Sequence, residues 1–323
     1  MSPQAGKNTD LTAALAERAE PVQADDSIAE AGRKLMLGEF IRMLRKEDGA
    51  RAGDDIEDVH DMRVAIRRMR SVFRLLGGYY RPKAIQPYRR SLRVVMQALG
   101  EVRDLDVMIH DLTAFLPQLD ESRVSAIQGV IDSLDQRRVV ARANLVRVLD
   151  AKTYRRFCHD FAAFLTTPAA GVRSLNGDGP VPYQVRHVVP PMIYERLADV
   201  RAYDVVLPTD DAPTLHQLRI AFKGLRYTIA LFDNLLGPEI SGFIAELKAI
   251  QDHLGRLNDI AVAHEQLGAL MADLEGDQSA ALWLYLEHLD AERPTLLAQF
   301  PAVWKRFNSK TVQRKLALAV LNL

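Results

Sequence analysis

Apolar residues recur at every third or fourth position along most of this sequence, and no stretch alternates cleanly between apolar and polar residues. This spacing predicts amphipathic α-helices and argues against strands. We therefore expect an all-α chain, with helices over residues 25–46, 57–76, 82–116, 121–149, 153–165, 191–203, 212–236, 239–272, 277–299 and 301–323.

Changes in composition predict where the chain divides into domains. Residues 166–190 are rich in glycine and proline, which predicts a linker or long loop. Residues 1–24 are small and polar with no sustained period, so we expect a flexible segment there. Between and after these segments the pattern predicts two helical domains, residues 25–165 and residues 191–323.

The two predicted domains contain similar blocks of sequence. Residues 59–76 read VHDMRVAIRRMRSVFRLL, and residues 215–232 read LHQLRIAFKGLRYTIALF. Further along, LGEVRDLDV over residues 99–107 matches LGRLNDIAV over residues 254–262. Because both blocks occur in the same order at nearly the same spacing, we expect two tandem four-helix-bundle repeats with a pseudo-twofold relation.

The first repeated helix carries an apolar stripe and a basic stripe at helical spacing. The apolar stripe consists of Met62, Ile66, Met69, Phe73 and Leu76. The basic stripe consists of His60, Arg63, Arg67, Arg70 and Arg74. Each basic residue is one position from an apolar one, so the stripes lie about 100° apart and the basic stripe borders the core. Solvated helix faces usually place acids four residues from such cations, and the arginines here have none among them, which favours an anion-binding site.

The second repeat carries a thinner version of the basic stripe. Its cations are His216, Arg219, Lys223 and Arg226. Gly224 stands where the first repeat has Arg68, and Ala230 stands where it has Arg74. We therefore expect the second repeat to contribute less to anion binding than the first.

The total charge of the chain hides this segregation of cations. Lysine and arginine number 42, aspartate and glutamate number 42, and apolar residues make up 48%, as in an ordinary globular protein. Residues 59–103, however, hold eleven basic and two acidic residues, and ten of the eleven are arginine. Arginine binds two phosphate oxygens at once through its planar fork. The next long helix adds Arg89, Arg93 and Arg103, which would flank a groove beside the first stripe.

Other residue counts exclude several kinds of site. Cys158 is the single cysteine, which excludes an intramolecular disulfide and a cysteine metal cluster and is consistent with a reducing cytosol. No uninterrupted apolar run of 18 residues occurs, so we expect a cytoplasmic protein with no membrane partner. The histidines fall into no metal-ligand spacing, and we predict no metal site, no cofactor and no catalytic residue.

The paired blocks resemble the CHAD family, the conserved histidine α-helical domain. The family pattern is H-x-x-R-[VI]-x-x-[KR]-x-[LM]-R followed by L-G-x-x-x-D, and both repeats carry it over a resemblance that spans residues 25–323. The resemblance implies a pair of helical bundles that binds inorganic polyphosphate without catalysis, often at polyphosphate granules. Together with the basic stripes, it leads us to predict these polyphosphate-binding residues: His60, Arg63, Arg67, Arg70, Arg74, Arg89, Arg93, Arg103, His216, Arg219, Lys223, Arg226 and Lys248.

Two pairs of residues in the pattern have alternative roles. His60 and His216 are either direct phosphate ligands or structural histidines, held by the Asp104 or Asp259 of the same repeat. Gly100 and its counterpart Gly255 lie inside predicted helices, where glycine costs about 1 kcal/mol relative to alanine. We expect close helix crossing to be the reason for these glycines, in preference to backbone approach to a ligand.

Two other functions compete with polyphosphate binding. A histidine phosphotransfer protein would use His60 or His216 in a four-helix bundle, although each histidine begins its helix and no receiver or kinase domain accompanies it. A nucleic-acid-binding helical module is electrostatically competent, but it is disfavoured because the stripes lack base-reading Asn or Gln and stacking aromatics. Divalent cations could accompany bound phosphate without a protein ligand.

Overall fold

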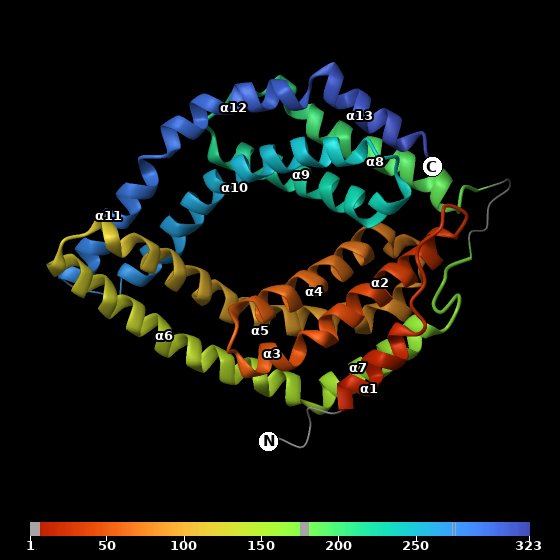
Figure 1. The fold of residues 1–323 in the computed structure, drawn as a ribbon, viewed down its shortest axis with the longest axis horizontal. Coiled ribbons are helices and arrows are strands. Elements are labelled where there is room, and N and C mark those ends of the chain that lie inside the picture. The colour runs from red at the N-terminus through yellow and green to blue at the C-terminus, as the bar shows by residue number, and fades with distance from the viewer. Residues whose placement is uncertain (1–6, 175–180, 273, 275) are drawn as a thin grey trace. The chain divides into compact units, whose positions relative to one another are not determined.

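The described part of the chain consists of helices and their connections. The computed structural model describes residues 7–174, 181–272, 274 and 276–323, and within them it has α-helices, short 3-10 helices and no strand (Figure 1). The all-α prediction is confirmed. The α-helices are α1 (Lys7–Ala16), α2 (Ile28–Arg45), α3 (Glu47–Ala52), α4 (Ile56–Leu76), α5 (Pro82–Phe115), α6 (Glu121–Asp150), α7 (Lys152–Thr166), α8 (Val185–Arg201), α9 (Ala212–Phe232), α10 (Ile240–Met271), α11 (Asp277–Asp290), α12 (Arg293–Phe307) and α13 (Lys310–Val320).

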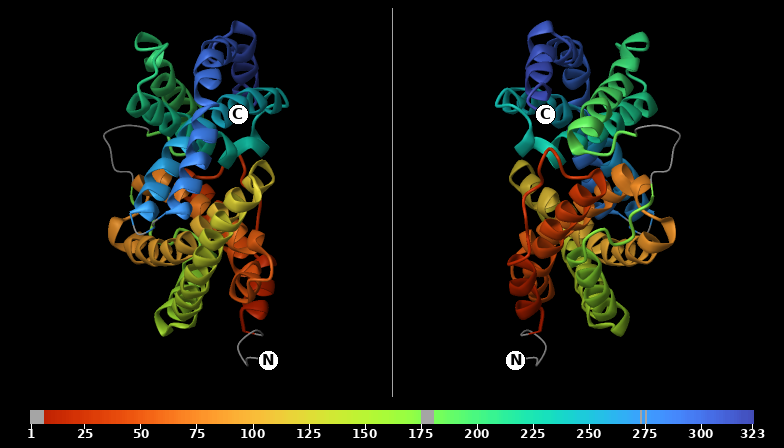
Figure 2. Two further views of the ribbon diagram at one scale, coloured as in Figure 1. Left: turned by 90° about the vertical axis from the view of Figure 1, so that its left-hand side faces the viewer. Right: turned by 90° about the vertical axis from the view of Figure 1, so that its right-hand side faces the viewer.

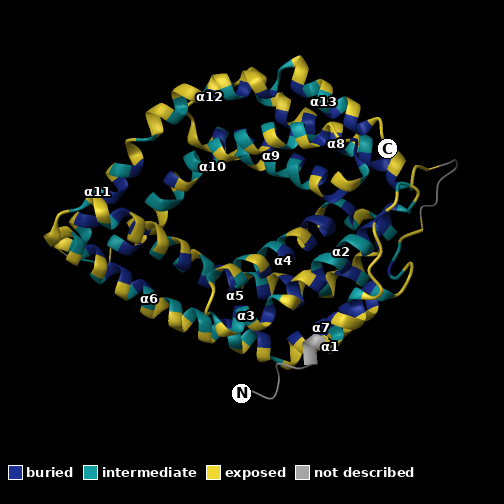
Figure 3. Cartoon of the chain, viewed as in Figure 1, coloured by how far each residue is buried: buried dark blue, intermediate teal, exposed yellow. Residues whose placement is uncertain are grey.

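The chain forms two compact units. Unit 1 comprises Met1–Asp111 and Asp132–Val185, and unit 2 comprises Leu112–Ile131 and Arg186–Leu323. Two further views show the helices of each unit from other sides (Figure 2). Helices such as α2 and α4 carry buried and exposed residues along one ribbon, as amphipathic helices do (Figure 3). No helix in the described residues is long and apolar enough to cross a membrane.

An aromatic cluster around Phe161 on α7 organises unit 1. Phe161 is fully buried, and its ring lies 5.1 Å from that of Phe40 on α2 and 4.8 Å from that of Tyr88 on α5. The ring of Phe73 on α4 lies 6.2 Å away. These centroid distances are typical of favourable aromatic pairs. One side chain thus contacts three helices, including both helices that carry the predicted arginines of the first repeat.

Side-chain caps begin the two repeated helices. Asp55 accepts a 2.9 Å hydrogen bond from the backbone N–H of Glu57 at the start of α4. Asp211 accepts a 2.9 Å hydrogen bond from the backbone N–H of Thr214 at the start of α9. Both helices contain 21 residues, and a one-turn 3-10 helix follows each of them. Such caps satisfy amide groups that have no partner within the helix.

Several predicted boundaries differ from those of the structure. Residues 277–323 form three helices, where two were predicted over 277–299 and 301–323. Helix α12 continues through Pro301, and the next helix, α13, begins after Ser309, whose side chain caps it. The segment 1–24 contains helix α1, in which Leu15 is buried. Helix α8 begins at Val185, inside the predicted linker, and residues 175–180 of that linker lie outside the described residues.

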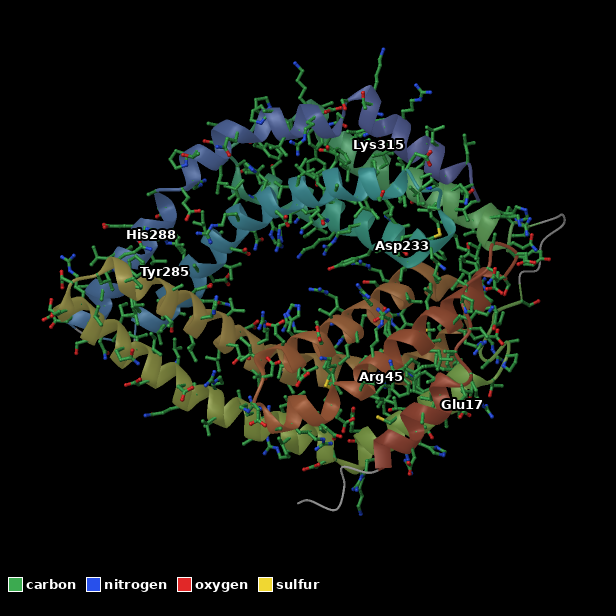
Figure 4. The ribbon with its side chains drawn as sticks, viewed as in Figure 1. Glu17, Arg45, Asp233, Tyr285, His288 and Lys315 are labelled. Carbon is green, nitrogen blue, oxygen red and sulfur yellow. The ribbon has the colours of Figure 1, made fainter. Side chains whose placement is uncertain are left out.

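Residues 112–131 were predicted to lie in the first domain, yet they belong to unit 2. The reason is local apolar packing at the end of α5. The ring of Phe115 lies 5.1 Å from that of Tyr285 and 5.1 Å from that of His288, both on α11 (Figure 4). Phe115 is 5% exposed, so this contact removes a large aromatic surface from water.

Cys158 is expected to resist alkylation in the folded protein. Its side chain is buried on α7, and burial together with the negative charge of Glu47 raises the pKa of the thiol to about 12. Because the thiolate is the reactive form, iodoacetamide at pH 8 should modify the protein in denaturant and leave the native protein unmodified, as measured by mass spectrometry. Equal rates in both states would contradict the buried placement.

The same pKa shift predicts how stability depends on pH. The folded pKa of Cys158 lies above the ordinary value of 9.0, so the protonated thiol favours folding. This contribution is fully present below about pH 9 and is lost as pH rises towards 12. A Cys158→Ala variant should therefore lose less stability than the wild type over that range.

Candidate functional site

Helix α4 holds the basic stripe at the edge of the unit 1 core. The predicted apolar stripe is buried: Met62, Ile66, Met69 and Leu76 are fully buried and Phe73 is 2% exposed. Beside it, Arg63 and Arg67 are half-buried, and Arg70 and Arg74 are exposed. The predicted placement of the basic stripe, next to the core instead of opposite it, is therefore confirmed.

Helix α5 brings two further arginines into electrostatic range of Arg70. The pKa of Arg70 lies below its usual value, first because of partial burial and second because three other cations lie nearby. In order of decreasing effect, these cations are Arg93, Arg74 and Arg89. We call Arg70, Arg74, Arg89 and Arg93 the arginine cluster. Like charges at short range repel one another, so the cluster is a local concentration of positive potential that an anion would relieve.

Carboxylates accompany the other end of the stripe. Nη1 of Arg63 lies 3.8 Å from a carboxylate oxygen of Asp104, and Nη1 of Arg103 lies 3.7 Å from one of Glu57. Both distances are longer than a hydrogen bond, and both carboxylates are more than half exposed. These ion pairs are weak and solvated.

Neither histidine pairs with the aspartate that the structural alternative named for it. His216 Nδ1 lies 2.9 Å from the side-chain oxygen of Asn258, not against Asp259. His60 is half-buried, and in the described part of the chain it makes no hydrogen bond to Asp104. Asp104 instead lies beside Arg63, because the arginine side chain crosses the open position at Gly100 to reach it.

The reason predicted for the glycines is wrong. A Cβ added at Gly100 would lie 2.8 Å from Nη1 and 3.9 Å from Cζ of Arg63, and within 4 Å of no other described residue outside its own stretch of helix. At Gly255 an added Cβ would lie within 4 Å of none of the described residues beyond its own stretch of helix. Neither glycine therefore marks a close crossing of helix backbones.

Unit 2 carries the second stripe on α9 and α10. Arg219, Lys223 and Arg226 are half-buried on α9, and His216 is exposed at its start. The guanidinium of Arg226 lies over the ring of Tyr227 at 5.4 Å from the centroid, within cation–π range. Lys248 is exposed on α10.

One basic residue of α4 faces a different environment. Nη1 of Arg68 lies 3.1 Å from a carboxylate oxygen of Glu39. The Arg68 side chain also lines a cavity of about 290 Å³ between α2 and α4, together with Arg42 and Arg45. Arg45 is labelled on α2 in Figure 4. Because Arg68 comes one residue after Arg67, its side chain points about 100° away from the basic stripe around the helix axis. Sequence spacing alone separates these two groups of arginines correctly.

The described residues contain no group of three or more His, Cys, Asp and Glu side chains placed to hold a metal ion. Acidic residues near the stripe are dispersed: Asp104 and Glu57 each lie beside a different arginine. The arrangement is therefore suited to holding anions by charge and hydrogen bonding, because arginine donors dominate it.

Comparisons with known proteins agree with this architecture. The model of the CHAD domain family matches residues 35–268. Among solved structures, the CHAD domain from the plant Ricinus communis is 24% identical, with 94% of this chain and 95% of that chain covered and a TM-score of 0.64. PptA from Streptomyces chartreusis is 14% identical, with 86% and 99% covered and a TM-score of 0.61. A search of curated proteins found no match. Since the family model covers well over half of its length, the chain belongs to the CHAD domain family.

Proposed function

We propose that this protein binds inorganic polyphosphate through the basic stripe of unit 1, without catalysing a reaction on it. The arginine cluster is the observation that carries the proposal. Four guanidinium groups from α4 and α5 lie close enough for three of them to lower the pKa of the fourth. A polyanion would remove this repulsion and accept charge-assisted hydrogen bonds from each group.

The length of the stripe supports an extended ligand over a single phosphate ion. From Arg63 to Arg74 the helix rises about 16 Å at 1.5 Å per residue. One phosphate can engage one or two guanidinium groups, whereas a chain of phosphates can engage cations along the whole stripe. Arg89, Arg93 and Arg103 on α5 would add further contacts.

The second repeat plays the smaller part in this proposal. Its stripe has His216, Arg219, Lys223 and Arg226 on α9 and Lys248 on α10, and Ala230 stands where the first repeat has Arg74. Association with cytoplasmic polyphosphate granules would follow from the same binding, and divalent cations could accompany the phosphates. Specificity would come from charge density and chain length, since the stripe lacks side chains that read bases.

A salt titration tests the proposal on the full chain. Cations that neutralise phosphates release counterions, so affinity for long-chain polyphosphate should fall about a hundredfold between 50 and 200 mM salt if roughly five cations participate. Random single-stranded DNA of equal total charge should compete poorly. Failure to bind polyphosphate at 50 mM salt, or displacement by an equal charge of DNA, would contradict the proposal.

A further inference from the structure

Gly100 leaves a space on α5 that the Arg63 guanidinium fills. The residue is buried within the helix, and, its own stretch of α5 apart, the described residues bring only Nη1 and Cζ of Arg63 within 4 Å of the position its Cβ would take. At 2.8 Å, Nη1 would be closer to this Cβ than the Cβ atoms of real proteins come to a non-bonded atom. Any residue other than glycine would therefore displace the guanidinium.

The carboxylate of Asp104 lies near the same guanidinium, one turn further along α5. One of its oxygens lies 3.8 Å from Nη1 of Arg63, the atom that lies over Gly100. The arginine is thus limited on one side by the helix backbone and on the other by a negative charge. Its side chain is 29% exposed, which leaves part of the group open to a ligand.

The second repeat shows that this arrangement is not a general requirement of the fold. Gly255 occupies the aligned position on α10, and the space beside it is empty to 4 Å. There the fixed group is His216, which lies 2.9 Å from Asn258, the residue aligned with Arg103. The same sequence pattern therefore positions an arginine in unit 1 and a histidine in unit 2.

We propose that Gly100 is a positioning residue for polyphosphate binding: it seats the Arg63 guanidinium against α5, beside the carboxylate of Asp104. This inference rests on the proposed function of the basic stripe. Holding a long side chain in place before the ligand arrives reduces the rotamer entropy that is lost on binding. Displacing it should weaken binding without weakening the fold, because the obstructing atoms are the end of a flexible side chain.

The test compares Gly100→Ala with Gly255→Ala, which makes the same change where no side chain is displaced. Gly100→Ala should weaken polyphosphate binding about fivefold and lower the slope of log affinity against log salt by up to one unit. Gly255→Ala should bind as the wild type does. Both variants should keep or raise the melting temperature, since alanine favours helix over glycine.

A double-mutant cycle with Arg63→Ala decides whether the effect acts through Arg63. In the Arg63→Ala background, which itself should bind more weakly than the wild type, Gly100→Ala should cause no further loss. The inference is overturned if Gly100→Ala binds normally, if it weakens binding equally without Arg63, or if Arg63→Ala has no effect. Failure of the wild-type chain to bind polyphosphate would instead remove the proposed function itself.

Discussion

Replacing Arg63, Arg67 and Arg70 together with glutamate is expected to abolish retention of long-chain polyphosphate at moderate salt. Each replacement removes a charge-assisted donor from the basic stripe and adds a charge that repels phosphate. It also converts the repulsion around Arg70 into attraction towards Arg93, Arg74 and Arg89, so the remaining cations would be neutralised within the protein. Affinity measured by titration should fall by at least about a hundredfold.

Two matched triple variants separate position from total charge. Lys152, Arg155 and Arg156 are exposed on α7, and their replacement with glutamate changes the net charge equally. That variant should bind almost as the wild type does. Replacement of Arg219, Lys223 and Arg226 should have an intermediate effect, because the basic stripe of the second repeat has fewer cations than that of the first. If all three variants lost binding equally, the cations would act through net charge and not as a site.

Phe161→Ala is expected to be the most destabilising single substitution in unit 1. The side chain is fully buried and its ring contacts those of Phe40, Phe73, Tyr88, Phe157 and Phe164. Truncating a buried phenylalanine costs about 3–5 kcal/mol through lost burial and the remaining cavity. For a unit of this size the melting temperature should fall by roughly 10 °C, measured by circular dichroism or calorimetry.

Phe161→Leu provides the control for that substitution, since it retains apolar volume and should cost less than about 1.5 kcal/mol. Long-chain polyphosphate should raise the melting temperature of both variants, because it binds the folded state and not the unfolded state. A Phe161→Ala variant with wild-type stability would show that the aromatic cluster does not hold these helices together.

The stripes on α4 show what local sequence pattern can predict. The expected helix over residues 57–76 differs by one residue from Ile56–Leu76, and the apolar positions from Met62 to Leu76 are buried as expected. Helical periodicity depends on neighbours three and four residues away, so the sequence of one segment contains it. The position of the basic stripe beside the core follows from the same periodicity.

Helical periodicity does not predict which residues of different helices contact one another. Pairing of His216 with Asn258 instead of Asp259 depends on the rotation of α10 against α9, and one residue changes that rotation by about 100°. The placement of residues 112–131 in unit 2 depends on the burial of Phe115 against α11, far away in the sequence. No local pattern contains these partners.

Two properties could be predicted from the sequence alone, because both follow from spacing within one helix: the chain is helical, and the arginines of the first repeat form a stripe along the edge of the core. Which cations lie together became known from the packing of the helices. This packing brings Arg93 and Arg89 of α5 to Arg70 of α4, and it places Arg63 over Gly100. The physical reason is that the distance between side chains on different helices depends on how the helices pack, which is a property of the whole core.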